Sequence, residues 1–178
     1  MVEFALIAPL LMTLTFGLLE FGLFFKNYLT VANTTRTAAR VGSSVGKSAD
    51  ADYQILQAIK AAASALPSGA SSIQAVSIYK ATATGGDPPT VCKTGPSAAS
   101  LCNYYTAASL NLAATAFGGT TGKPDAYWSP TTRDVSQAAG TDYIGVWVKT
   151  NHNFVTKLFG TSRAITDAVV MRLEPVTS

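Results

Sequence analysis

The sequence VEFALIAPLLMTLTFGLLEFGLFF, residues 2–25, decides how this chain is built. From Phe4 to Phe25 it is apolar almost without a break, and a carboxylate, Glu3, comes directly before it. A helix of that length measures about 33 Å at ~1.5 Å per residue, which matches a bilayer hydrocarbon core of roughly 30 Å. The stretch therefore predicts a membrane-spanning helix.

A cleaved export signal is the competing interpretation of this apolar run. Such signals have a basic region, an apolar stretch of about 7 to 15 residues and a small-residue cleavage site. The run in this sequence is longer, and no Lys or Arg stands ahead of it. We therefore expect the segment to remain in the protein as a helix.

Two residues interrupt the apolar run. Pro9 has no amide hydrogen to donate to the carbonyl of Ala5, so we expect a kink or a short melted segment there. Glu20 lies inside the run, although a charged side chain near the bilayer centre costs about 2.5 to 3.5 kcal/mol. Its helical neighbours three and four residues away cannot pair with it. Two interpretations stay open: Glu20 lies near the headgroups, or it contacts another subunit.

The helix is expected to continue beyond the apolar run. Residues 26–45 keep a recurrence of apolar and small residues every three to four positions, with Arg36 and Arg40 one turn apart. The simplest expectation is one helix of about 45 residues, apolar in its first half and amphipathic in its second. We assign residues 1–47 to this helix and residues 48–178 to a globular head.

The head is predicted to have an α+β fold. A helix is expected over residues 51–66, because its apolar residues fall on one stripe and Pro67 follows. Alternating apolar residues predict strands over residues 73–83, 143–150 and 165–173. A long Gly-, Pro-, Ser- and Thr-rich insertion, about residues 85–140, separates the first strand from the others. We expect one helix packed on an antiparallel sheet of three or four strands.

The two cysteines of the chain favour a disulfide within this insertion. Cys92 and Cys102 are ten residues apart, and the single histidine, His152, is distant in sequence. That pattern lacks the additional ligands of a metal site. A disulfide would close part of the insertion, and it implies an oxidising compartment.

The N-terminal residues resemble a known family. The opening Val-Glu-Phe-Ala at residues 2–5, Pro9, Glu-Phe-Gly at residues 20–22 and Ala-Ala-Arg at residues 38–40 before Gly42 are similar to TadE-like pilins. These are pilins of the tight-adherence (Tad) type IV pilus family. The closing MRLEP, residues 171–175, resembles the end of that family.

The resemblance implies a structural pilin subunit. Such a subunit is held in the inner membrane, trimmed by a prepilin peptidase, and extracted by inner-membrane machinery into an extracellular filament used in surface attachment. Its partners are then other copies of itself or related pilins, and the membrane before assembly. By resemblance, Glu3 would neutralise the N-terminal amine of a neighbouring subunit and set axial register, and we group Glu20 with it as an assembly residue.

The position of Glu3 departs from the family pattern. The glutamate of these pilins lies five residues from the peptidase cut, whereas here it is residue three. We expect either that two residues are missing from this sequence or that processing differs. The alternative function is a singly anchored envelope protein that acts as a pilus assembly factor or a sensor.

An enzyme is not indicated by this sequence, and we expect no catalytic, cofactor-binding or metal-binding residues. Residues 42–48 read like a phosphate-binding loop, but the glycines are too close together and a helix precedes them. We interpret that segment as a flexible joint, and His152 as a residue at a sheet end. A net charge of +3 is too small and dispersed to indicate nucleic-acid binding. Only 13 % of the residues are charged, which suggests extensive burial against other subunits.

Overall fold

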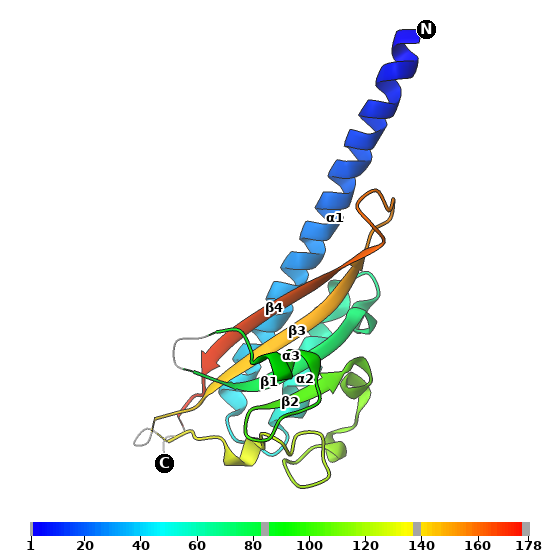
Figure 1. Cartoon of the computed structure of the whole chain (residues 1–178). Coiled ribbons are helices and arrows are strands. Elements are labelled where there is room, and N and C mark those ends of the chain that lie inside the picture. The colour runs from blue at the N-terminus through cyan, green and yellow to red at the C-terminus, as the bar shows by residue number, and fades with distance from the viewer. Residues whose placement is uncertain (1, 83–85, 137–139, 176–178) are drawn as a thin grey trace.

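Helix α1, Val2–Val45, is a single uninterrupted helix whose N-terminal half projects away from the rest of the molecule (Figure 1). Its C-terminal half lies across one face of a β-sheet, beside a second helix, α2, Ala51–Ala62. The structure, a computed structural model, describes residues 2–82, 86–136 and 140–175, apart from the side chains of residues 2, 3 and 5. A long helix followed by a small α+β head is the predicted fold class.

Within the described residues the sheet has four strands, all antiparallel, in the order β2-β1-β3-β4. Its central strands are β1, Ile73–Ala81, and β3, Tyr143–Asn153. Its edges are β2, Cys102–Thr106, and β4, Ser162–Arg172. β3 and β4 pair along all eleven residues of each strand. The resulting hairpin extends along α1 toward its apolar half, so the tip of the hairpin stands beside the helix (Figure 1).

The other described elements are short. They comprise helix α3 and five 3₁₀ turns. Their bounds are Thr90–Thr94 for α3 and Ala63–Ala65, Gly69–Ser72, Ala107–Asn111, Ala114–Ala116 and Pro130–Thr132 for the turns.

The main core lies between the sheet and the two long helices. Alternate residues of β1 and β3 face this core, as a period of two predicts, and one stripe of α2 meets them. Val31, Ala38 and Ala39 of α1 are buried in the same core. The proposed units, residues 1–47 and 48–178, therefore share one core, and the boundary between them stays a prediction. The buried aliphatic residues of the head include Ile55, Leu56, Ile59, Val76, Ile78, Ile144, Val146 and Val148.

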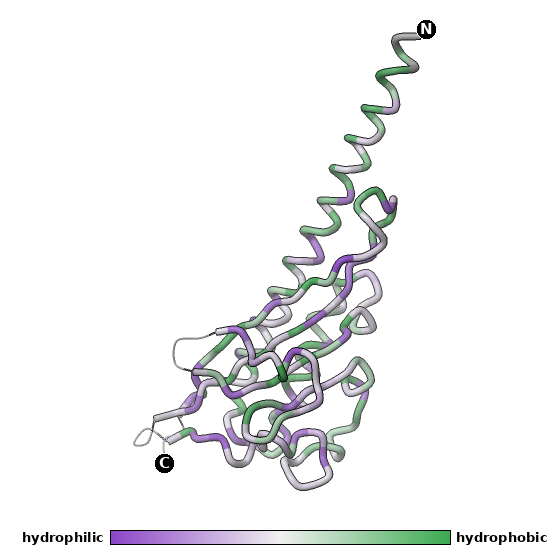
Figure 2. The backbone as a smooth tube through the Cα atoms, in the orientation of Figure 1, coloured by the Kyte–Doolittle hydropathy of each residue, from purple (hydrophilic) through white to green (hydrophobic). Residues whose placement is uncertain are grey.

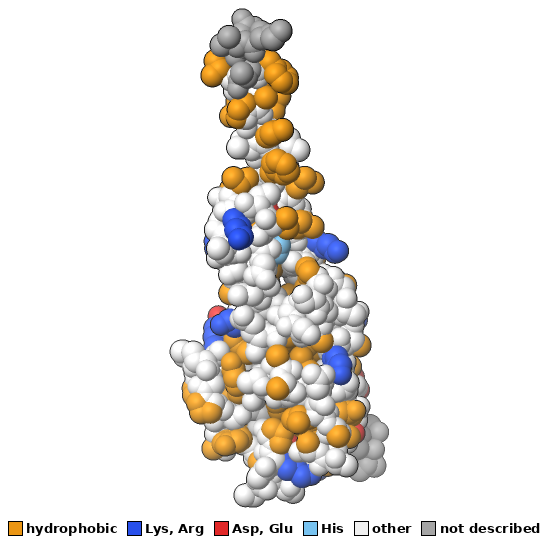
Figure 3. Space-filling view, turned by 90° about the vertical axis from the view of Figure 1, so that its right-hand side faces the viewer, with side chains coloured by type: hydrophobic (Ala, Val, Ile, Leu, Met, Phe, Trp, Pro, Cys, Tyr) orange, Lys and Arg blue, Asp and Glu red, His pale blue; other side chains and the backbone are white. Residues whose placement is uncertain are grey.

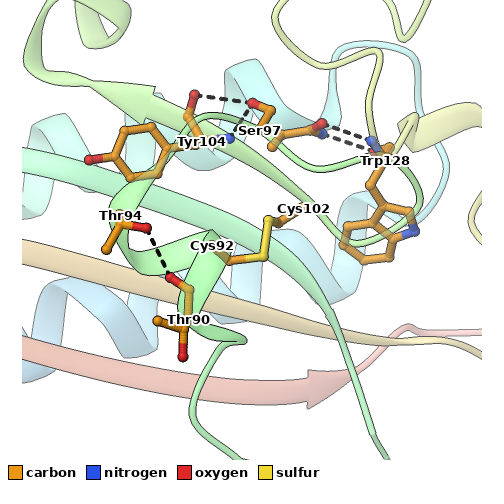
Figure 4. Close-up of a disulfide and its surroundings, with 8 residues drawn as sticks. Thr90, Cys92, Thr94, Ser97, Cys102, Tyr104 and Trp128 are labelled. Atoms are coloured by element: carbon orange, nitrogen blue, oxygen red, sulfur yellow. Dashed lines mark hydrogen bonds between the residues drawn. A yellow bond between two sulfur atoms is a disulfide. The ribbon is translucent and has the colours of Figure 1, made fainter.

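The opposite face of the sheet carries a smaller cluster that includes the predicted disulfide. Cys92 of α3 is bonded to Cys102 of β2, with their Cα atoms 6.0 Å apart (Figure 4). Both cysteines are fully buried in one cluster with Tyr79 and Trp147. The disulfide thereby ties the first part of the insertion to the sheet.

The helix α1 passes the head closely at Gly42. A Cβ atom placed on Gly42 would lie 3.0 Å from Ile144 Cδ1 and 3.1 Å from Ile55 Cδ1. Our interpretation of residues 42–48 as a flexible joint is therefore wrong for its first part, because residues 42–45 are helical and packed. The chain turns only at Gly46, where φ is +55°.

Other expectations differ from the structure in detail. α1 is continuous through Pro9, so no melted segment forms there, and the kink stays a prediction. Helix α2 ends at Ala62 and passes into a 3₁₀ turn rather than continuing to residue 66. Strand β2 was not predicted at all. It is only five residues long and lies inside the insertion, where its polar neighbours hide the alternation.

The close packing at Gly42 predicts how substitutions should affect stability. Gly42→Leu should lower the free energy of unfolding of the head by about 1–3 kcal/mol, because the new side chain must displace Ile144 and Ile55. The measurement is thermal unfolding in detergent, followed by the fluorescence of Trp128 and Trp147. Gly22→Leu is the matched control, since a Cβ at helical Gly22 meets nothing within 4 Å. Equal effects of the two substitutions would contradict the packing described.

Candidate functional site

The N-terminal half of α1 presents a large exposed apolar surface. Phe4, Leu6 and Leu18 are each 75–76 % exposed. Hydrophobic residues predominate along this half of the helix (Figure 2), and hydrophobic side chains cover much of the face that Figure 3 shows. Among the described helices, α1 is the one long and apolar enough to cross a membrane. Exposed apolar surface of this extent marks a contact with lipid or with another protein.

Glu20 breaks this surface, and its side chain is buried within the monomer. Only 1 % of Glu20 is exposed, because the loop between β3 and β4 folds over it. The backbone amide of Thr156 donates to Glu20 Oε1 at 2.6 Å, and the Thr156 hydroxyl donates to the same oxygen at 3.1 Å. The partner that helical spacing could not supply is therefore 136 residues away in the sequence. Glu20 Oε2 is buried without a hydrogen-bond partner among the described residues.

The loop over Glu20 comprises residues 154–161, which we call the hairpin tip. It closes with a hydrogen bond from Phe154 N to Thr161 O at 3.1 Å and another from Gly160 N to Lys157 O at 3.2 Å. Lys157 and Gly160 have φ values of +60° and +102°. These left-handed residues allow the chain to reverse within a few positions.

The hairpin tip is held on α1 by aromatic packing as well as by Glu20. The ring of Phe159 lies 3.7 Å from where a Cβ atom of Gly17 would be, and its centroid is 5.1 Å from that of Phe21. Gly17 thus makes room for an aromatic ring of the tip.

A buried polar pair lies about two turns beyond Glu20 along α1. Asn27 Nδ2 is 2.7 Å from His152 Nδ1, and both residues are buried. Phe24 and Phe154 pack edge-on against the His152 ring, with centroids at 5.4 and 5.0 Å. His152 lies at the end of β3, as predicted, and its contacts fix the hairpin on the helix.

An apolar hollow of about 460 Å³ opens beside Glu20. Its walls come from one face of α1 and from the hairpin tip, including Phe16, Leu19, Leu23 and Val155. The hollow opens at the surface of the N-terminal half of α1, next to the covered carboxyl group of Glu20. It is a candidate contact for an apolar side chain of a neighbouring molecule.

A second buried cluster holds the insertion on the head. Asp52 of α2 accepts from Arg133 Nη2 at 2.5 Å, from the Tyr105 hydroxyl at 2.6 Å and from Asn103 Nδ2 at 2.7 Å. The guanidinium group of Arg133 also lies 4.3 Å above the ring of Trp128. All these residues are buried, and the charge of Asp52 is compensated by partners from two other segments, β2 and the insertion around Arg133. The cluster thereby ties α2, β2 and the insertion together.

Burial of Tyr105 and its contact with Asp52 change its ionisation. Loss of solvent, and then the negative charge of Asp52, raise the pKa of the Tyr105 hydroxyl well above its usual value of 10.0. Burial likewise raises the pKa of Tyr79 to about 12. The folded head therefore keeps both phenols neutral at pH values where an exposed tyrosine ionises.

The residues predicted from the sequence fall in different places. Glu20 and Pro9 both lie on α1, and Cys92 and Cys102 lie on the far face of the sheet. The side chain of Glu3 lies outside the described part of the structure. Sequence reasoning missed Thr156 and Phe159. The available signal was an apolar segment, with Asn-Phe at residues 153–154 and Leu-Phe-Gly at residues 158–160, between two predicted strands. The aromatic residues Tyr105 and Trp128 of the insertion pack in the core, whereas Tyr127 is half exposed.

The family comparison bears on the helix that carries Glu20. A family model described as TadE-like protein matches residues 1–40. The N-terminal segment of this chain is TadE-like. The match confirms the resemblance and associates the chain with the Tad pilus. The TadE-like family is not a family of enzymes.

The TadE-like match ends within α1 and covers the apolar half, Glu20 and most of the amphipathic half. Comparison with curated proteins finds no match, and comparison with solved structures finds none either. The description of the head therefore rests on its own residues and contacts.

The raised pKa values predict how stability depends on pH. A tyrosine whose pKa is raised on folding stabilises the protein below its unfolded pKa of ~10, and this contribution is lost as the pH rises further. The free energy of unfolding should therefore fall more steeply above pH 10 in the native protein than in Tyr105→Phe. Urea unfolding in detergent between pH 8 and 11 measures the difference. Parallel curves for the two proteins would contradict the assignment.

Proposed function

We propose that this chain is a structural pilin subunit of a Tad-like type IV pilus. The apolar half of α1 holds the subunit in the inner membrane before assembly. In the extracellular filament the same half packs against other copies of itself or related pilins, and the head forms the outer surface. A prepilin peptidase and the inner-membrane assembly machinery are the expected partners, and the filament serves surface attachment.

The observation that carries the proposal is the unequal burial of one continuous helix. The C-terminal half of α1 is packed into the head through Val31, Ala38 and Ala39, whereas the described apolar side chains of the N-terminal half are mostly exposed, and the hairpin tip contacts this half near Glu20. A soluble monomer would leave this apolar surface in water. A helix that enters lipid first and a bundle of copies afterwards keeps it covered in both states.

The burial and hydrogen bonding of the Glu20 side chain support a role in which the N-terminal half of α1 is itself buried. Its carboxyl group is capped by the Thr156 amide and hydroxyl rather than left at the surface of the stalk. A polar group that enters an apolar environment is tolerated when hydrogen bonds satisfy it. At the level of Glu20, the N-terminal half of α1 therefore presents an almost entirely apolar exterior to lipid or to neighbouring helices.

The amphipathic half of α1 supports the same arrangement. Lys26, Arg36 and Arg40 are exposed on the side of the helix that faces away from the head. Basic groups at the end of an apolar span suit the membrane interface before assembly. In a filament they would lie between neighbouring heads, where carboxylates such as Glu174 are exposed.

The direct test is whether the chain is found in filaments. Surface fractions sheared from producing cells are examined by electron microscopy with an antibody against the head. Labelling along the length of filaments supports a subunit role. Filaments that form normally without this chain, together with the chain confined to the inner membrane, would overturn the proposal and support the assembly-factor or sensor alternative.

The assembly role of Glu3 gives a sharper prediction. Glu3→Ala should leave membrane insertion intact and abolish filaments, because the amine of the neighbouring subunit would lose its charge partner. Membrane fractionation and microscopy of sheared material measure the two effects separately. Asp87→Ala, which removes an exposed carboxylate from the head, is the matched control and should assemble normally. Normal filaments from Glu3→Ala would refute the role.

A further inference from the structure

The hairpin tip lies beside the apolar part of α1, not beyond its end. Its contacts reach Gly17, Glu20 and Phe21. From Phe4 to Phe16 the helix is only about 20 Å long at ~1.5 Å per residue, which is too short for a hydrocarbon core of about 30 Å. Tilting the helix shortens its projection further. If α1 spans a bilayer, the hydrocarbon core must therefore extend past Phe16, and the hairpin tip enters the leaflet that surrounds this part of the helix.

The side chains of the hairpin tip suit that depth. Val155 is 74 % exposed, and Leu158 and Phe159 are each 51 % exposed, whereas most large apolar residues of the head are buried. Two exposed basic residues, Lys157 and Arg163, flank them. Apolar side chains between basic ones are typical of segments that lie at the boundary of acyl chains and headgroups.

The backbone of the hairpin tip also makes hydrogen bonds within the protein that suit an environment with little water. The amide of Phe154 donates to Thr161 O, that of Gly160 to Lys157 O, and that of Thr156 to Glu20 Oε1. The amide of Leu158 donates to the Thr156 hydroxyl oxygen at 3.4 Å. Alternate amides of the tip thus have protein acceptors, which lowers the cost of moving the loop out of water.

We infer that the hairpin tip is a second membrane-inserting element of the subunit. Val155, Leu158 and Phe159 enter the acyl boundary of a phospholipid bilayer beside α1, and Lys157 and Arg163 contact the lipid phosphates. The tip covers the carboxyl group of Glu20, which would otherwise face lipid. The inference rests on the membrane-anchored state of the proposed function, but not on filament formation.

The test places fluorescent probes on single introduced cysteines of the full chain. Cys92 and Cys102 are bonded to each other, so only the introduced thiol reacts. The three sites are Val155→Cys in the tip, Met12→Cys in the apolar half of α1 and Thr121→Cys, an exposed residue of the insertion. Each labelled protein is reconstituted in phosphatidylethanolamine and phosphatidylglycerol vesicles that contain lipids with spin labels at shallow or deep acyl positions.

The expected result is that deep labels quench the probe at residue 12, shallow labels quench the probe at residue 155, and neither quenches the probe at residue 121. Quenching at 12 without quenching at 155 would overturn the inference and leave the anchored helix standing. No quenching at 12 would overturn the membrane anchor itself, and with it the inference.

A pair of variants separates lipid contact from general loosening of the head. Leu158→Ser with Phe159→Ser should reduce the quenching at residue 155 to that seen at residue 121. Val91→Ser with Leu101→Ser removes two exposed apolar side chains elsewhere on the head and should leave the quenching unchanged. Equal quenching in both double variants would contradict a contact made by the tip side chains.

Discussion

The contact between Glu20 and Thr156 fixes the position of the head on the N-terminal half of α1. One carboxyl oxygen on the apolar helix accepts both the amide and the hydroxyl of a residue in the hairpin tip. This contact gives one carboxyl oxygen two hydrogen bonds inside an apolar run, and it also fixes the longest hairpin of the head along α1. The aromatic contacts of Phe159 and Phe154 and the pair of Asn27 with His152 extend the same seam. The head and the helix therefore behave as one body up to the level of Gly17.

That arrangement gives a physical account of how one segment would serve the two environments of the proposed function. Above the seam, toward the N-terminus, the described side chains of the helix are apolar except for Thr13 and Thr15, whose hydroxyls donate to Leu10 O and Leu11 O. Such a surface suits both lipid and neighbouring helices. Below the seam, the helix is part of the core of the head. A subunit that moves from a bilayer into a filament then needs no refolding, because only the partners of its exposed half change.

The sequence predicted the parts of the molecule whose signal is local. The apolar run, the stripe of α2 and the alternation in β1 and β3 each depend on neighbouring residues, and all three are confirmed. The disulfide followed from there being only two cysteines. Strand β2 was missed because five residues inside a polar insertion carry too little alternation. The partner of Glu20 could not be found from sequence, because Thr156 is 136 residues away and has no distinctive neighbours. The packed cluster of Asp52 with Arg133 was missed for the same reason.

Hydrogen exchange at the amide of Thr156 tests this account most directly. In the native protein, in detergent or in a bilayer, the amide should exchange much more slowly than an unprotected one, because it donates to Glu20 Oε1 at 2.6 Å. In Glu20→Ala the protection of Thr156 should disappear, while amides in the centre of β3 stay protected. Rapid exchange of Thr156 in the native protein, with β3 fully protected, would contradict the seam between helix and hairpin.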